Sequence, residues 1–403
     1  MVNNIVGSAV RGDNFFGRDS FVDLTWRELA KGSVLLAAPR RFGKTSVMYR
    51  LMDAPRGGYK IVHADLEHLS DPVDLMLELV VKLSKDNKMG RLLEGVTAIS
   101  KDIWGGLQGT LEEVELFDVK LKLREQMKPQ WQEVGRQVFR RVGAAGHPVL
   151  FILDEFPMMI DRMARTPEKR EEARVLLNWL RALRQSPELG SVRFLIAGSI
   201  GIEAVLTELG EIKAINDFQS LKLDPFPPAV ADRFLQALAE TEQVPLPAEC
   251  REKMLEMVGI LVPYFLQILF SEVSKAHLLT GEPVTPDMIT RIYRDKVLGV
   301  DCKSYFDHYY GRLRDYYTPQ EEKAVKRLLR ELARVGAMTR DACFALYRET
   351  LGDESVGVDA FNTTINNLEN DFYIRYDAEA GRYEFACKLL RDWWLRHYAL
   401  EGA

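Results

Sequence analysis

The chain has 403 residues, which is enough for two or three domains that each bury their own core. Its hydrophobic share of 47% and charged share of 28% are those of an ordinary globular protein, which excludes a disordered or fibrous chain. The formal net charge of -5 gives no overall reason to expect nucleic acid as a partner, although a local basic face is compatible with it.

The N-terminal stretch MVNNIVGSAVRGDNFFGRD has no basic segment followed by an apolar one, and no apolar run approaches the roughly 20 residues of a membrane helix. We therefore expect a cytoplasmic protein without a membrane partner. The four cysteines are scattered without metal-ligand spacing, which favours plain buried thiols. They are Cys250, Cys302, Cys343 and Cys387.

Short apolar runs in the first half of the chain alternate with longer helix-like segments, which is the pattern of a parallel sheet covered by helices. The predicted strands are residues 33–38, 59–66, 148–155 and 192–199. A long stretch separates the second strand from the third. In it we predict a helix over 72–86 and a strand over 113–124, where EVELFDVKLKLR alternates, and we interpret the stretch as an insertion on the core sheet.

The strand signal stops after LKLDPFPP at 221–228, whose prolines indicate a domain boundary. Helical periodicity follows to about residue 300. The last hundred residues predict helices over 319–335, 339–350 and 358–369 and a hairpin that turns between Asp377 and Gly381, the order of a winged helix. The expected domains are an α/β domain over 1–222, a helical domain over 223–300 and a winged helix over 301–403.

Residues 38–46, APRRFGKTS, follow the first predicted strand and precede a predicted helix. A phosphate-binding loop needs inward amides, a helix N-terminus, a lysine for the outer phosphates and a hydroxyl for magnesium. Ala38 replaces the leading glycine of the usual pattern, at a position whose backbone often requires glycine. A simple turn between strand and helix is the alternative. The candidate nucleotide-binding residues are Pro39, Arg40, Arg41, Phe42, Gly43, Lys44, Thr45 and Ser46.

Asp154 and Glu155 end the strand VLFILDE, at the edge where ligands bind in open α/β sheets. Asp154 is suited to hold Mg²⁺, with Thr45 as the other metal ligand, and Glu155 is suited to polarise a water. A carboxylate pair that caps the next segment is the alternative. Ser199, after the fourth strand, is a candidate γ-phosphate sensor or a helix N-cap. A carboxylate beside a water favours ATP hydrolysis over phosphate transfer to another acceptor.

Two further clusters have plainer interpretations. HADLEH at 63–68 lacks tight metal-ligand spacing, so we expect surface or loop-end residues, although Asp65 ends a strand near the magnesium region. Five basic residues recur at helical spacing between 323 and 334, which is usually a solvated face. The predicted recognition helix VDAFNTTINNLEND carries acids and no bases, so the charge pattern does not support DNA binding.

Three stretches, NFFGRD at 14–19, APRRFGKTS and GILVPYFLQIL at 259–269, resemble the archaeal-type ATPase family, which belongs with the STAND and AAA+ ATPases. The resemblance spans nearly the whole chain. It implies an α/β P-loop fold with a helical lid and a C-terminal winged helix. It also implies that Phe16, Gly17 and Arg18 lie near the nucleotide and that Pro263 and Tyr264 approach the adenine. From the residues alone, core packing for Phe15 and Phe16 and a helix-start role for Pro263 are the favoured interpretations.

The sequence departs from this family after the fourth strand, where relatives often carry an arginine. None occurs between Arg193 and Arg233. We expect binding and hydrolysis of ATP with Mg²⁺, with Lys44, Glu155 and Ser199 as catalytic residues, and a protein partner or self-oligomer. The alternatives are a DNA-binding ATPase of the loader or transposition type and a nucleotide-binding scaffold without turnover.

Overall fold

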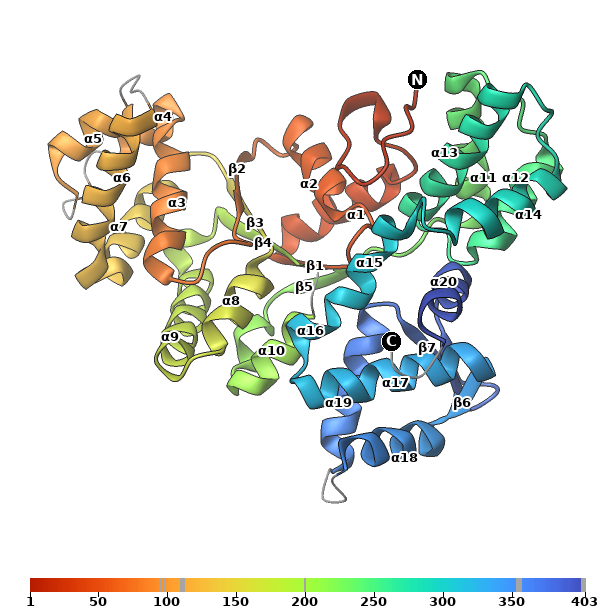
Figure 1. Cartoon of the computed structure of the whole chain (residues 1–403). Coiled ribbons are helices and arrows are strands. Elements are labelled where there is room, and N and C mark those ends of the chain that lie inside the picture. The colour runs from red at the N-terminus through yellow and green to blue at the C-terminus, as the bar shows by residue number, and fades with distance from the viewer. Residues whose placement is uncertain (94–95, 97–98, 109–112, 199–200, 353–356, 400–403) are drawn as a thin grey trace. The chain divides into compact units, whose positions relative to one another are not determined.

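The computed structural model describes residues 1–93, 96, 99–108, 113–198, 201–352 and 357–399 (Figure 1). The chain divides into two compact units. Unit 1 comprises Met1–Arg18, Pro39–Ser46 and Asp224–Ala403, and unit 2 comprises Asp19–Ala38 and Val47–Leu223. The segment of the predicted phosphate loop therefore groups with the C-terminal part of the chain.

Unit 2 is built on a five-stranded parallel sheet with the order β2-β3-β4-β1-β5. The strands are β1 (Val34–Ala37), β2 (Lys60–Asp65), β3 (Val149–Asp154), β4 (Val192–Gly198) and β5 (Gln219–Lys222). All four predicted strands are confirmed, whereas β5 was not predicted because only its Leu221 is buried. Strand β3 is buried along its whole length, as its unbroken apolar sequence requires.

The helices of unit 2 are α1 (Asp19–Lys31), α2 (Lys44–Asp53, which begins in unit 1), α3 (Pro72–Ser84), α4 (Asn87–Leu93), α5 (Lys101–Gln108), α6 (Glu113–Met127), α7 (Trp131–Gly143), α8 (Phe156–Ala164), α9 (Pro167–Arg184) and α10 (Ile202–Leu209). Those from α3 to α10 bury apolar residues in one core with the sheet. Helices α3 to α7 fill the stretch between β2 and β3 and stand together in Figure 1.

The predicted strand over 113–124 is wrong, because these residues belong to helix α6. Leu123 and Met127 are fully buried and Val119 packs against the core, which is a spacing of four residues. Leu121, which an alternating strand would bury beside Val119, is 47% exposed. The buried positions thus follow the helical period, and the alternation in the sequence does not report burial. The helix predicted over 72–86 is confirmed as α3.

Unit 1 continues from residue 224 with a series of helices. The first group is α11 (Pro228–Glu242), α12 (Ala248–Val258), α13 (Pro263–Thr280) and α14 (Pro286–Ile292). Of these, α11, α13 and α14 begin at prolines. Two short helices follow, α15 (Lys303–Gly311) and α16 (Leu313–Tyr316). Pro263 occupies the first turn of α13, so its helix-start role is confirmed.

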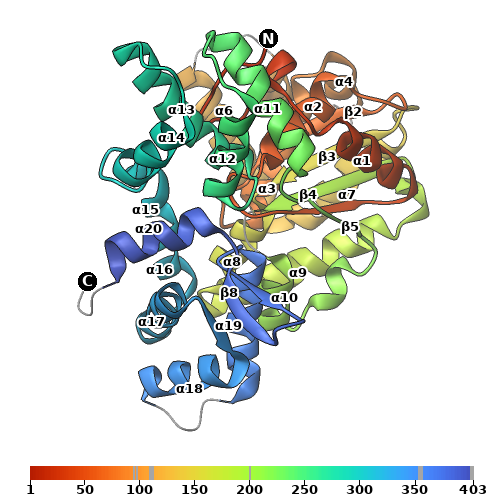
Figure 2. The same cartoon turned by 90° about the vertical axis from the view of Figure 1, so that its right-hand side faces the viewer.

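Residues 318–398, here called the C-terminal module, hold three helices, a small antiparallel sheet of order β6-β8-β7 and a final helix (Figure 2). The elements are α17 (Pro319–Val335), β6 (Ala337–Thr339), α18 (Arg340–Leu351), α19 (Val358–Asn370), β7 (Ile374–Asp377), β8 (Arg382–Phe385) and α20 (Lys388–Tyr398). The three helices and the hairpin that the sequence predicts are all present in the structure. A capping box between Thr318 and Glu321 begins α17, as its sequence favours.

All four cysteines are free and buried, which confirms the expected role as plain buried thiols. Among the described residues, no helix is both long and apolar enough to cross a membrane.

Candidate nucleotide site

The predicted phosphate loop, called the phosphate loop from here on, follows Ala37, the last residue of β1, and leads into α2, which begins at Lys44. Ala38 is buried and is not among the residues with a left-handed backbone, so alanine in place of the leading glycine causes no strain here. The left-handed positions of this loop are Arg41, with a φ of 71°, and Gly43, with a φ of 94°. A Cβ atom added at Gly43 would meet no atom within 4 Å, so there is open space beside this residue.

Lys44 is buried, and its ammonium donates to the carbonyl of Pro39 at 3.2 Å. The Lys44 side chain therefore folds back over its own loop. The hydroxyl of Ser46 accepts a hydrogen bond from the amide of Val10 at 3.0 Å, which ties the N-terminal segment to the loop. The loop, its lysine and the N-terminus of α2 together supply the parts of an anion site.

Tyr264 lies against the phosphate loop within unit 1. The guanidinium of Arg41 stands 4.9 Å from the centre of its ring and also donates to the carbonyl of Gly7. The Tyr264 hydroxyl donates to the carbonyl of Tyr305 at 3.1 Å. Burial raises the pKa of Tyr264 to about 12, against the opposing charge of Arg41, so the hydroxyl stays protonated as a donor.

Phe16, Gly17 and Arg18 pack on the start of the helical segment that follows residue 224. The Phe16 ring lies 5.4 Å from that of Phe234 in α11. Gly17 has a φ of 68°, and a Cβ atom there would come within 2.5 Å of Val230, so both conformation and space require glycine. Burial lowers the pKa of Arg18 to about 10, while neighbouring Asp224 opposes this, and its guanidinium covers the Phe226 ring at 4.6 Å.

The C-terminal module contacts the phosphate loop through the turn that follows α19, a feature that sequence analysis missed. The ring of Phe372 lies 4.7 Å from that of Phe42 in the loop. Phe372 has a φ of 59°, an unfavourable conformation for a bulky residue that surrounding contacts must hold. Asp371, beside it, pairs with Arg312 at 3.3 Å, and the side chains of Arg312 and Asp371 are 5% and 14% exposed.

Basic side chains of the phosphate loop affect the pKa values of two residues in this region, Asp371 and His308. Burial raises the pKa of Asp371, and the charges of Arg312, Lys44 and Arg40 oppose the rise. Burial, together with Arg41, Arg312 and Arg40, lowers the pKa of His308 to about 3. His308 is therefore neutral at physiological pH, and the Asp371 carboxylate lies within the field of the phosphate loop's lysine.

In unit 2, Asp154 ends β3 opposite Asp65 of β2 in the strand register. Asp154 is 7% exposed, and its carboxylate accepts the amide of Glu155 at 3.0 Å. Glu155 has a φ of 53°, and its side chain makes no cap hydrogen bond to α8, which argues against the helix-cap interpretation. A strained backbone that re-aims one carboxylate is typical of functional sites.

The end of strand β4 lies beside the start of helix α8. A Cβ atom at Gly198 would come within 2.5 Å of Pro157, so the end of this strand packs closely on α8. Ser199, the predicted sensor, lies outside the described residues. Asp154 and Glu155 thus belong to unit 2, whereas the phosphate loop, Phe16–Arg18, Pro263 and Tyr264 belong to unit 1.

Two arginines near the arginine-free span are held by internal contacts. Arg184 pairs with Asp217 at 2.9 Å and also covers the Phe218 ring, and its side chain is 5% exposed. Arg193 donates to the carbonyls of Gly190 and Leu29, among others. These contacts fit structural roles for both guanidinium groups.

The order of the parallel sheet and the loop between β1 and α2 are those of the P-loop nucleoside-triphosphatase fold. Among solved structures, a Walker-type ATPase of Pyrococcus abyssi matches 97% of this chain and 99% of its own chain, with a TM-score of 0.63 at 15% identity. The ORC2 protein of Aeropyrum pernix, in ADPNP–ADP complexes, matches 95% of this chain and 92% of its own, with a TM-score of 0.52 at 12% identity. No model of a known protein family matches the sequence, and neither does any curated protein.

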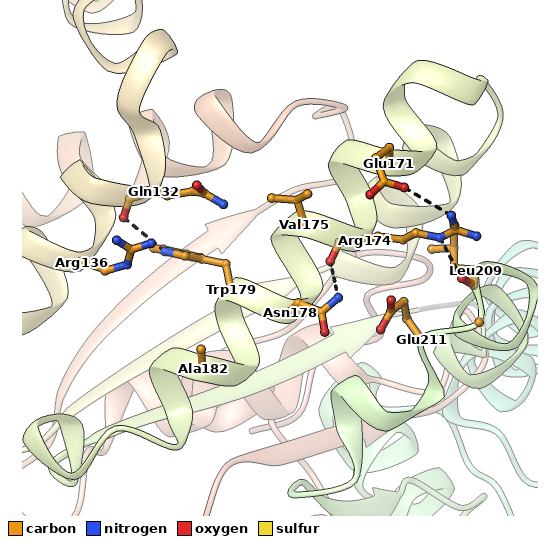
Figure 3. A pocket seen from close by; sticks show the side chains of 11 residues that line it. Gln132, Arg136, Glu171, Arg174, Val175, Asn178, Trp179, Ala182, Leu209 and Glu211 are labelled. Atoms are coloured by element: carbon orange, nitrogen blue, oxygen red, sulfur yellow. Dashed lines mark hydrogen bonds and ion pairs between the residues drawn. The ribbon is translucent and has the colours of Figure 1, made fainter.

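A separate hollow of about 610 Å³ lies in unit 2 beside α9 (Figure 3). Its charges are balanced and largely paired within the chain, as in the contact of Arg174 with Glu171 at 3.3 Å and with the carbonyl of Leu209 at 3.0 Å. Trp179 donates to the carbonyl of Gln132 at 3.2 Å. We assign no ligand to this hollow, because its two arginines and two glutamates leave no net charge.

Proposed function

We propose that the protein binds ATP with Mg²⁺ and hydrolyses it, and that hydrolysis is coupled to movement of a helical lid and a C-terminal winged helix. The proposed domains are residues 1–222, 223–300 and 301–403. The observation that carries the coupling is the contact between Phe42 of the phosphate loop and Phe372 of the C-terminal module. Any anion that enters the loop changes the charge balance at Asp371, which is held beside that contact.

Lys44 and the loop amides would hold the β- and γ-phosphates. The Thr45 hydroxyl and the Asp154 carboxylate are hard oxygen donors that suit Mg²⁺, which would neutralise charge between the two phosphates when bound. Glu155 would polarise the attacking water, and its left-handed backbone supports this role because the side chain is not used as a cap. Ser199 would sense the γ-phosphate.

We propose that residues of the N-terminal segment and of the helical lid recognise the adenine base of ATP. Tyr264 lies next to Arg41 of the loop, and Pro263 fixes the start of the helix that carries it. Phe16–Arg18 lie in the same unit and pack on α11. These placements support a lid that closes on the nucleotide from the side of α13.

The contact at Phe372 supports a restraining role for the C-terminal module. The Asp371 carboxylate lies within the field of Lys44 and Arg40, as a phosphate group would. A phosphate and this carboxylate compete for the same positive charge, so nucleotide binding would weaken the hold of the module on the loop. The nucleotide thereby biases a two-state contact, which is the physical requirement for a switch.

The phosphate-loop assignment is tested by isothermal titration of Lys44→Ala with ATP and Mg²⁺. We expect wild-type protein to bind and the variant to lose binding while its circular dichroism and melting temperature stay close to wild type. Lys169→Ala, which removes an α9 lysine that donates to Ser70, is a matched control for the loss of a lysine with an internal hydrogen bond. Equal affinity of wild type and Lys44→Ala would contradict the assignment.

A further inference from the structure

Unit 1 also contains a hollow, with a volume of about 360 Å³. Residues of α15, α17 and α20 line it. It is lined by Tyr310, Pro319, Glu322, Lys323, Lys326, Arg327, Arg330, Trp394 and Tyr398. These residues include four of the five basic residues that the sequence places at helical spacing, and the proposed ATPase chemistry uses none of them. We call this hollow, together with the residues that line it, the basic groove.

The floor of the basic groove is aromatic. The rings of Tyr310 and Tyr398 are stacked with their centres 3.7 Å apart and an angle of 5° between their planes. Trp394, which also lines the groove, is fully buried. Three of the lining residues are therefore aromatic.

The rim of the basic groove carries four cationic side chains and one carboxylate. Lys326 pairs with Glu322 at 2.5 Å, and Arg327 pairs with Glu349 at 2.8 Å. Lys323 is exposed and has no acidic partner among the described residues. The groove is therefore net positive on a chain whose overall charge is -5.

We propose that the basic groove docks an acidic segment of a partner protein that inserts an aromatic or aliphatic side chain between α17 and α20. An aromatic floor within a cationic rim is complementary to a segment that alternates carboxylates with apolar anchors. The volume suits one or two inserted side chains. This interaction goes beyond the proposed ATPase activity and does not depend on it.

The same geometry disfavours nucleic acid as the occupant. Tyr310 has Tyr398 stacked on one face and the Lys326 ammonium 3.7 Å from its ring centre, so its faces are not open to stack on a base. A duplex is read by cations spread along its backbone, whereas these cations surround a hollow and most are already paired with acids. Helix α19 adds no basic side chain to the surface.

The test is a selection of random displayed peptides of about twelve residues on the full chain, followed by fluorescence anisotropy with the enriched peptides. We expect enrichment of peptides that combine Asp or Glu with Phe, Trp, Tyr or Leu. Lys323→Glu should weaken their binding by at least about fivefold, because it reverses the charge that lacks an internal partner. Arg334→Glu is the matched control, since Arg334 lies on the same helix, is 65% exposed and does not line the groove.

Three outcomes would overturn the proposal. The enriched peptides could lack an acidic excess, or Lys323→Glu and Arg334→Glu could weaken binding equally. A labelled DNA duplex could also bind more tightly than the peptides and lose that binding in Lys323→Glu, which would make the groove a nucleic-acid surface. Binding of ATP, measured on the same samples, should not change in Lys323→Glu, so failure of this proposal is separable from failure of the ATPase proposal.

Discussion

The ring of Phe372 lies 4.7 Å from the ring of Phe42, which joins the C-terminal module to the phosphate loop across most of the length of the chain. Phe372 holds a left-handed backbone to make this contact, and the adjacent Asp371 places a buried carboxylate in the field of the loop's lysine. The strained backbone of Phe372 and the carboxylate of Asp371 held away from water both cost free energy. We therefore expect the contact between Phe372 and Phe42 to break when an anion binds in the phosphate loop.

Glu155→Gln is expected to keep ATP binding and to slow hydrolysis by about a hundredfold or more, the usual contribution of a positioned general base. The amide preserves the shape of the side chain and removes its basicity. Phosphate release under saturating ATP and Mg²⁺ measures the rate, and titration calorimetry measures the binding. Wild-type turnover in this variant would mean that Glu155 has a structural role only.

The pH dependence of stability should reveal His308. Its folded pKa of about 3 is below the value of about 6.5 for an unfolded histidine, so the unfolded chain binds an additional proton between these pH values. The free energy of unfolding therefore falls as the pH is lowered through this window. Melting temperatures of wild type and His308→Gln at pH 7 and pH 5 check this.

We expect the wild type to lose more stability than His308→Gln between pH 7 and pH 5. His68→Gln, which changes an exposed histidine, is the control and should follow the wild type. An equal loss in wild type and His308→Gln would show that His308 does not retain its neutral form in the folded protein.

ATP hydrolysis is expected to be slow in the isolated chain and to speed up with a second copy or a partner. The chain has no arginine between Arg193 and Arg233, and Arg184 and Arg193 are engaged in internal contacts. An arginine supplied to the γ-phosphate accelerates hydrolysis by about 10³ to 10⁵ in GTPases. The measurement is the ATPase rate per chain over a wide range of protein concentration. A high rate that does not vary with concentration in a demonstrated monomer would contradict this expectation.

The sequence predicts the sheet well because buried strands such as 149–154 are unbroken apolar runs, and it predicts the C-terminal helices because their apolar residues recur at helical spacing. It fails at residues 113–124, where apolar residues happen to alternate although burial follows the helix. Strand β5 is short and exposes three of its four residues, so it leaves no apolar signal.

The phosphate loop and the carboxylates after β3 are recognisable in the sequence because each is a local pattern. The contact of Phe42 with Phe372 and the pair of Arg312 with Asp371 are not, because they join residues that are far apart in the chain. The left-handed backbone of Phe372 is likewise invisible in a sequence where glycine or asparagine would be the usual signal for it.

The ATPase activity of Phe372→Ala tests the central claim, the coupling of nucleotide turnover to the C-terminal module, most directly. Tyr376→Ala is the matched control, because Tyr376 is an aromatic residue of the same module that is 46% exposed. Loss of the Phe372 ring should loosen the module from the loop and raise the fraction of chains that can bind ATP. We predict a rise of about threefold or more in kcat/KM for ATP in Phe372→Ala, and a rate close to wild type in Tyr376→Ala. An unchanged or lower kcat/KM in a Phe372→Ala protein that is folded would contradict the claim.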